Sequence, residues 1–171
     1  GDKLIAVAFN YGYPSGVWTS TNSGLAWTQT SAPTTNWWNA VASSADGNKL
    51  LVTDRGFYRY PSWIYASTNT GADWQRIIPI GPGAEYLTTV ASSADGIKCM
   101  AASLWHIYAS NDSGQTWLPT SATGLFNGSG WVGIGASADG NRWVAVWQDG
   151  WIYLSADAGL NWTTSSAPSL S

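Results

Sequence analysis

Three observations in the sequence predict an all-β repeat fold. Short polar turns that end in tryptophan recur four times, at intervals of 47, 43 and 45 residues. Between them lie short segments rich in Val, Ile, Trp, Tyr and Thr, separated by Gly, Asp, Asn and Pro, which are strand and turn signals. No window keeps the 3.6-residue apolar period of a helix long enough to compete. The 171 residues are one domain by size and are enough to bury a core.

Each period contains four strand candidates in a fixed order, A to D. In the second period these are the segments 41–45, 49–52 and 63–67, and a fourth that begins at Trp74. The Asp-Gly pairs at 46–47, 95–96 and 139–140 suit tight A-to-B hairpins that need a positive φ. Four strands in about 45 residues is the arithmetic of a β-propeller blade. We therefore predict one β-propeller domain, 1–171, with four repeat units at approximately 1–36, 37–85, 86–130 and 131–171.

The first repeat lacks its strand A. The opening GDKLIAV aligns with residues 47–52, and the closing SSAPSLS aligns with residues 30–36, so fifteen strands are expected where four complete blades need sixteen. An open edge exposes unpaired backbone groups and invites pairing. Three alternatives follow: part of a longer repeat protein, a closed four-bladed ring with one three-stranded blade, or head-to-tail pairing with other copies in a larger ring or open assembly.

The recurring turn has the pattern S-x-D-x-G-x-T-W in its third copy, SNDSGQTW. Its Ser and Asp side chains suit hydrogen bonds to the turn backbone, its Gly suits a left-handed conformation, and its Trp suits packing over the blade. In the other copies, Asn replaces Asp at 22 and 69, while Ala26, Asp73 and Asn161 replace Thr. This pattern resembles the Asp-box (BNR) repeat family, found in sialidases, sortilin-type receptors and several lectins.

The resemblance implies that these turns lie at the outer edge of the blades, away from the ligand face. We therefore interpret the Ser, Asp or Asn, Gly and Trp residues that recur in the four turns as structural. These are Ser20, Asn22, Gly24, Trp27, Ser67, Asn69, Gly71, Trp74, Ser110, Asp112, Gly114, Trp117, Ser155, Asp157, Gly159 and Trp162.

The opposite face carries the B–C and D–A loops, which differ between repeats, and variable loops on a rigid scaffold are where function concentrates. Flat aromatic rings beside amide, guanidinium and carboxylate groups suit sugars, because the rings stack on pyranose C–H faces while polar groups bind hydroxyls. The alternative for each tryptophan is packing between blades. Candidate ligand-binding residues are Trp38, Asp54, Arg55, Arg59, Glu85, Trp105, Trp147, Asp149 and Trp151.

The first functional hypothesis is a non-catalytic, lectin-like module that binds glycans by aromatic stacking. The second is a structural or assembly protein that contacts other proteins or other copies of itself through the open blade edge. A sialidase-like glycoside hydrolase is the third. Hydrolysis needs two carboxyl groups across a cleft, and nothing in the spacing of Asp54, Glu85 and Asp149 selects a pair. No catalytic residue is predicted, and His106 has no second histidine for a metal or triad site.

Composition limits the partners further. A net charge of −3 and a pI near 4.7 argue against nucleic acid. No run approaches the ~20 apolar residues of a membrane span. The single cysteine, Cys99, excludes an internal disulfide and a Cys-rich metal site, and the turn motif has too few carboxylates for calcium, so no cofactor or metal is expected. The low Lys content and the abundance of Trp, Ser, Thr, Asn and Gly favour an extracellular or cell-surface location.

Overall fold

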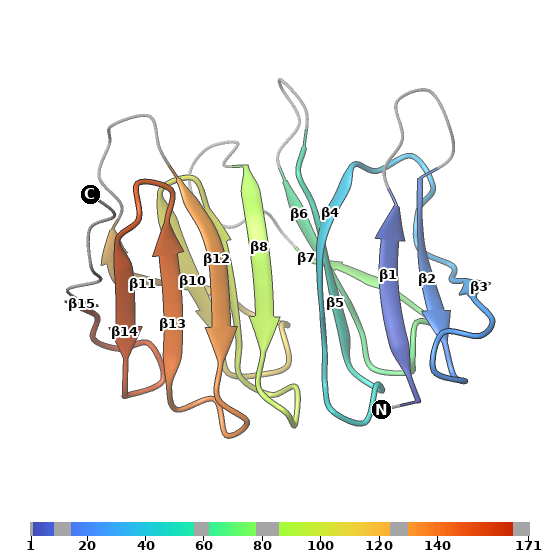
Figure 1. Cartoon of the computed structure of the whole chain (residues 1–171). Coiled ribbons are helices and arrows are strands. Elements are labelled where there is room, and N and C mark those ends of the chain that lie inside the picture. Colours follow the sequence, from blue (N-terminus) through green and yellow to red (C-terminus); the bar gives the residue numbers. More distant parts are fainter. Residues whose placement is uncertain (1, 9–14, 57–61, 78–85, 124–129, 166–171) are drawn as a thin grey trace.

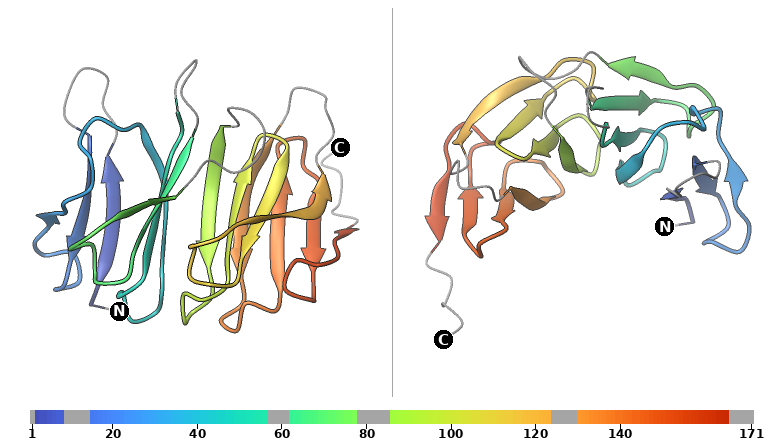
Figure 2. Two further views of the ribbon diagram at one scale, coloured as in Figure 1. Left: turned by 180° about the vertical axis from the view of Figure 1, so that it is seen from behind. Right: turned by 90° about the horizontal axis from the view of Figure 1, so that it is seen from above.

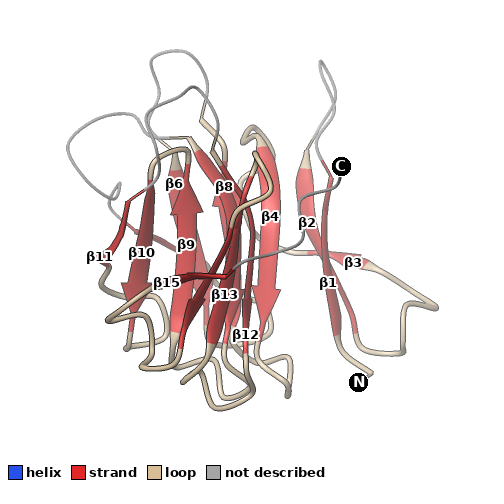
Figure 3. Ribbon diagram, turned by 60° about the vertical axis from the view of Figure 1, so that its left-hand side comes forward, coloured by secondary structure: helices blue, strands red, loops and turns tan. Residues whose placement is uncertain are grey.

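The computed structural model describes residues 2–8, 15–56, 62–77, 86–123 and 130–165, and within them every regular element is a β-strand (Figures 1 and 3). The first sheet contains β1 (Leu4–Ala8), β2 (Gly16–Ser20) and β3 (Thr28–Gln29). The second contains β4 (Trp38–Ser43), β5 (Leu50–Asp54), β6 (Trp63–Ser67) and β7 (Gln75–Ile77). The third contains β8 (Leu87–Ser92), β9 (Cys99–Ser103), β10 (His106–Ser110) and β11 (Leu118–Thr123). The fourth contains β12 (Trp131–Ala136), β13 (Trp143–Trp147), β14 (Ile152–Ser155) and β15 (Thr163–Ser165).

Every sheet is an antiparallel meander in which consecutive strands are neighbours. The all-β prediction is therefore confirmed, and the first sheet has three strands where the others have four. None of the described residues forms a helix that is long and apolar enough to span a membrane.

The four sheets stand side by side along an open arc (Figure 2, right). The strands β1, β4, β8 and β12 contact one another in sequence on the concave side, and β3, β7, β11 and β15 lie on the convex side. Among the described residues β1 pairs only with β2, and β15 pairs only with β14. The described residues therefore show an open arc and no closed four-bladed ring, which was one of the three alternatives above.

The middle strands of the second and third sheets are apolar on both faces because each of these two sheets is covered on both sides by a neighbouring sheet. All five residues of β5 are buried, and its alternating side chains point to opposite faces. Leu51 belongs to the apolar cluster between the second and third sheets, whereas Val52 belongs to the cluster between the first and second. A strand buried on both faces reads as a continuous apolar run rather than an alternating one, as LLV does here.

The four tryptophan-ending turns share one hydrogen-bond pattern. In each, the backbone N–H of the glycine donates to the serine Oγ at 2.9 Å, and the serine hydroxyl donates to the Asn or Asp side chain at 2.8–2.9 Å. Two successive residues have positive φ, as at Ser113 (61°) and Gly114 (82°). The tight turn is therefore held by its own side chains.

Three of the turn tryptophans pack at boundaries between sheets. Trp74 packs against the cluster between the first and second sheets, Trp117 against the one between the second and third, and Trp162 against the one between the third and fourth. Trp27, in the first sheet, is 43% exposed. Inter-sheet packing of these rings is therefore a repeated element of the fold.

Candidate functional site

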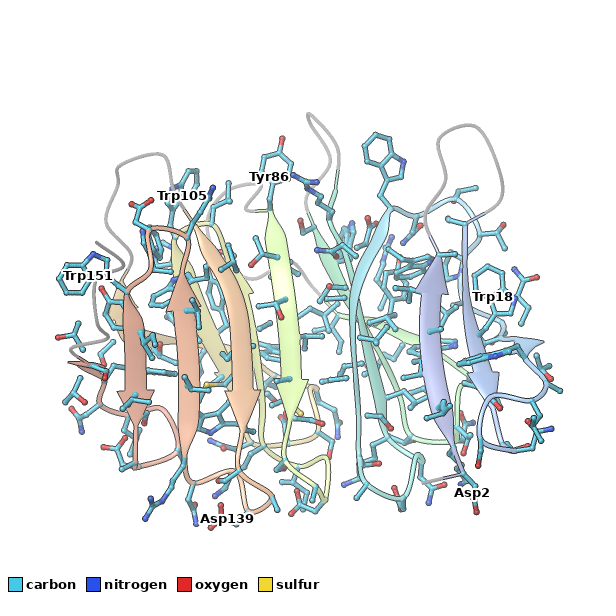
Figure 4. All side chains as sticks on the ribbon, in the orientation of Figure 1. Asp2, Trp18, Tyr86, Trp105, Asp139 and Trp151 are labelled. Atoms are coloured by element: carbon cyan, nitrogen blue, oxygen red, sulfur yellow. The ribbon has the colours of Figure 1, made fainter. Side chains whose placement is uncertain are left out.

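A pocket of about 400 Å³ is lined by residues at the starts of β4, β8 and β12 and in the turns that follow β5, β9 and β13. It spans the second, third and fourth sheets, because β4, β8 and β12 begin side by side there. Tyr86, Trp105 and Trp151 lie at this end of the molecule, and Asp2 and Asp139 lie at the opposite end (Figure 4). The pocket is lined by Asn39, Arg55, Tyr86, Leu87, Thr88, Leu104, Gly130, Trp131, Val132 and Gln148.

The amide of Asn39 is fixed in one orientation. Its Nδ2 donates to the carbonyl oxygen of Leu87 at 2.6 Å, and its Oδ1 accepts the Thr53 hydroxyl at 2.8 Å. Because β4 and β8 belong to different sheets, this amide also ties the second sheet to the third. A side chain held at both ends is preorganised for binding.

The backbone of Arg55 is held while its side chain is exposed. The Arg55 N–H donates to the Trp37 carbonyl at 2.9 Å, and the Ser62 hydroxyl donates to the Arg55 carbonyl at 2.6 Å. Ser62 Oγ in turn accepts the N–H of Leu87 at 3.1 Å, so the loop that carries Arg55 is bonded to the start of β8. The guanidinium therefore extends from a fixed base.

Asp54 lies beneath this surface and does not line the pocket. It is 8% exposed, and its Oδ1 accepts the N–H groups of Trp37 at 3.1 Å and Gly56 at 3.0 Å. Burial raises the pKa of this carboxyl above its usual value, against the opposing effect of the two backbone hydrogen bonds. Its contacts are those of a residue that shapes the Arg55 turn.

Two candidate tryptophans are buried between sheets. Trp38 is 2% exposed, its Nε1 donates to the Pro33 carbonyl at 3.1 Å, and its ring meets Tyr65 edge-on at 5.0 Å. Trp147 is 1% exposed and meets Trp131 edge-on, also at 5.0 Å. Neither presents an open ring face to solvent. In this structure both therefore pack between sheets, which was the alternative to ligand binding given above for each tryptophan.

The remaining candidates surround the pocket or lie outside the described residues. Trp105 is half-buried in the β9–β10 turn, beside the lining residue Leu104, and Asp149 is exposed beside the lining residue Gln148. Trp151, immediately before β14, is 50% exposed. Arg59 and Glu85 fall in segments that the structure does not describe.

Three lining residues that the sequence did not single out occupy one position in the repeat. Asn39, Thr88 and Val132 are the second residues of β4, β8 and β12, the strands on the concave side. A repeat position whose side chain differs between repeats could have pointed to these pocket-lining residues. Its significance depended on knowing that the three strands begin side by side.

The lining combines a guanidinium, two amides, a hydroxyl and the Tyr86 phenol with apolar surface from Leu104 and Val132. None of the described lining residues is Asp or Glu. Such a set can donate and accept hydrogen bonds around a polar ligand while aromatic and aliphatic surface covers its C–H groups.

Comparison with solved structures identifies the fold. The chain is similar to a GH74 xyloglucanase from Xanthomonas campestris (17% identity, TM-score 0.66, 96% of this chain and 29% of that one). It is also similar to YCF48 from Cyanidioschyzon merolae (11% identity, TM-score 0.62, 90% of this chain and 53% of that one). A protein assigned as TolB from Agrobacterium tumefaciens matches with 16% identity and a TM-score of 0.66, over 96% of this chain and 61% of that one.

These structures are β-propeller proteins, so the chain has the fold of a β-propeller. It spans less than two thirds of the length of each of the three. No protein-family model and no curated protein matches the sequence.

Proposed function

We propose that this chain is a carbohydrate-binding module that holds a glycan in the pocket at the starts of β4, β8 and β12 without hydrolysing it. The observation that carries the proposal is the pocket of about 400 Å³, in which Tyr86 stands near the fixed amide of Asn39 and the exposed guanidinium of Arg55. The size suits one or two sugar rings, because small-ligand pockets begin at about 300 Å³.

The chemistry of the lining supports a sugar over other small ligands. A pyranose presents C–H groups on one face and hydroxyls around its rim, so it needs both a flat ring and many donors and acceptors. Tyr86 offers the ring, and Gln148 offers an amide that both donates and accepts. Asn39 and Thr88 offer oxygen acceptors, because their hydrogens are already donated to backbone carbonyls. A glycan ligand also agrees with the extracellular or cell-surface location that the composition favours.

Binding is proposed rather than hydrolysis because of what the lining offers. Glycoside hydrolysis uses a pair of carboxyl groups, whereas this pocket presents amides, a hydroxyl and a guanidinium. One similar structure is named a xyloglucanase, which makes β-glucan oligosaccharides a sensible first panel for this chain.

We also infer that the four tryptophan-ending turns are Asp-box turns with a scaffolding role. Their support is the shared serine-centred hydrogen bonding and the inter-sheet packing of Trp74, Trp117 and Trp162. Under this assignment the turns lie at the end of the sheets opposite the pocket.

The test is a glycan array followed by calorimetric titration of the best ligand. We expect saturable binding that Tyr86→Ala weakens by about tenfold, the effect of losing roughly 1.4 kcal/mol of stacking and contact. Tyr86→Phe should keep most of the affinity. Trp27→Ala, which removes a 43% exposed aromatic ring from the first sheet, a sheet that contributes no residue to the lining, is the control and should leave affinity unchanged.

The proposal fails if the folded protein binds no member of the panel, or if Tyr86→Ala binds as well as the unaltered chain. Turnover of a fluorogenic glycoside by the purified protein would replace binding with hydrolysis as the function.

A further inference from the structure

The second and third boundaries between sheets are built in the same way, whereas at the first boundary the turn glycine, Gly71, lies against Thr30. Each turn lies over a side chain of the preceding sheet, and its tryptophan fills the space beside it. A Cβ placed on Gly114 would lie 2.7 Å from Leu51 Cδ2, and one on Gly159 would lie 2.1 Å from Met100 Cε. Leu51 is 4% exposed and Met100 is 1% exposed, so the next sheet covers both of them.

The rim of these boundaries also repeats. The Lys3 ammonium donates to Asn48 Oδ1 at 2.7 Å across the first boundary, and the Lys98 ammonium donates to Asn141 Oδ1 at 2.5 Å across the third. At the second boundary the Lys49 ammonium donates to the Asp95 carbonyl at 3.0 Å. At each boundary, therefore, a lysine just before β1, β5 or β9 reaches a turn of the next sheet.

The outer face of the fourth sheet corresponds to the faces of the second and third sheets that pack against the following sheet, but no sheet covers it. Val144 occupies the repeat position of Leu51 and Met100 and is 37% exposed, while Leu154 occupies that of Ala66 and Ala109 and is 44% exposed. Together with Gly135 and Thr163 these residues line a pocket of about 570 Å³. At the internal boundaries, the equivalent place on the second sheet is filled by Trp117, and that on the third sheet by Trp162.

The outer face of the first sheet carries the turn tryptophan that could fill such a pocket. Trp27 occupies the repeat position of the three boundary tryptophans and is 43% exposed, and Leu4 beside its turn is 41% exposed. At the rim, Asp2 occupies the position of Asn48 and Asn141, and the Ser23 hydroxyl donates to its Oδ1 at 3.1 Å. On the fourth sheet, Arg142 occupies the position of Lys3 and Lys98.

We propose that a second copy of this chain docks head to tail, with Trp27 of one copy in the Val144–Leu154 pocket of the other and Arg142 paired with Asp2 at the rim. The first and third internal boundaries join a lysine to a neutral asparagine, whereas the two end faces offer an arginine and an aspartate. This complementarity favours a second copy, because such a pair can form a bidentate, charge-assisted contact. The contact is heterologous, so repeated docking produces a ring if the rotation closes and a filament if it does not.

The direct test is the molar mass of the chain over a range of concentrations, by sedimentation equilibrium and light scattering. We expect mass to rise with concentration, and Trp27→Ala or Val144→Glu to raise the dissociation constant by at least about tenfold, as loss of a central anchor does. Leu118→Ser changes a leucine that is 72% exposed on β11, away from both end faces, and should leave the association unchanged.

Mixing the two variants tests the head-to-tail arrangement. Trp27→Ala keeps an intact pocket and Val144→Glu keeps an intact tryptophan, so the mixture should form one-to-one dimers and nothing larger. Circular dichroism of each variant establishes that it is folded. A chain that stays monomeric throughout, or variants that fail to combine while each remains folded, would overturn the proposal.

Charge reversal tests the rim pair separately. Arg142→Asp and Asp2→Arg should each weaken association by about two- to fivefold at low salt, and the double variant should restore it. Single reversals without effect, or a double variant no better than either one, would contradict the Arg142–Asp2 contact.

Discussion

Met100 lies directly against Gly159 across the boundary between the third and fourth sheets, and a Cβ on that glycine would come within 2.1 Å of Met100 Cε. Gly159 also has a φ of +88°. The glycine is therefore required twice, once for the backbone conformation of its own turn and once for the close approach of the neighbouring sheet. The turn motif and the inter-sheet packing meet at this residue.

Gly159→Ala should destabilise the protein more than Gly150→Ala does. Gly150 has a φ of +90° and no atom within 4 Å of its added Cβ, so alanine there meets backbone strain of about 1 kcal/mol alone. At Gly159 the Met100 side chain must also move, which adds about 1 kcal/mol. Urea unfolding of both variants measures the difference, and equal losses would show that Met100 moves at no cost.

Ser110→Ala should cost about 1–3 kcal/mol of the free energy of unfolding, because it leaves a buried N–H without an acceptor. Ser110 Oγ accepts the N–H of Gly114 at 2.9 Å and donates to Asp112 Oδ1 at 2.8 Å, and Ser110 is 3% exposed. Its exposed neighbour Asn111 provides the control, since Asn111→Ala should change stability by less than about 0.5 kcal/mol. Thermal unfolding followed by circular dichroism compares the two.

Acid should destabilise the protein between about pH 4 and pH 2, partly through Asp139. Hydrogen bonds from the Ser137 hydroxyl and from Asn141 lower the pKa of Asp139 from 3.8 to about 2. A lowered native pKa means that the stabilisation is present above the unfolded value and is lost as the pH falls through the native one. Asp139→Asn should therefore flatten the stability profile in this window, and an unchanged slope would contradict this role.

Asp54→Asn should leave stability at pH 7 equal or slightly higher. The amide oxygen can still accept the N–H groups of Trp37 and Gly56, and the buried charge is removed. Because burial raises the pKa of Asp54, this carboxyl contributes most stability at low pH and less as the pH rises through the raised value. Asp54→Ala removes the acceptor as well and should cost about 1–3 kcal/mol. Chemical denaturation at pH 7 distinguishes the two, and similar losses in both would show that the charge itself is needed.

Cys99 should resist thiol reagents in the folded protein. The side chain is 1% exposed, and burial raises the pKa of its thiol to about 12, so almost none is present as the reactive thiolate at pH 8. A disulfide-exchange reagent should modify it only after denaturant is added. Rapid reaction of the native protein would show that the cluster between the second and third sheets opens readily.

Much of the fold could be predicted because its determinants are local. The Asp-Gly hairpins, the serine-centred turns and the apolar segments define each strand and its neighbour, so the fifteen strands and the three-stranded first sheet follow from short-range pattern. The pocket was harder to predict. Asn39, Thr88 and Val132 lie in different repeats, and only the side-by-side start of β4, β8 and β12 brings them together.

The sequence by itself therefore determined the number of sheets, their strand order and the chemistry of their turns, because these depend on hydrogen bonds between segments adjacent in the chain. The tertiary structure alone decided that Trp38 and Trp147 are buried, that Trp27 is exposed, and that the sheets form an open arc. The physical reason is that side-chain burial and curvature arise from sheet-on-sheet packing. Strand periodicity shows that a residue belongs to one face of a sheet, but the face of the neighbouring sheet decides whether that residue meets protein or solvent.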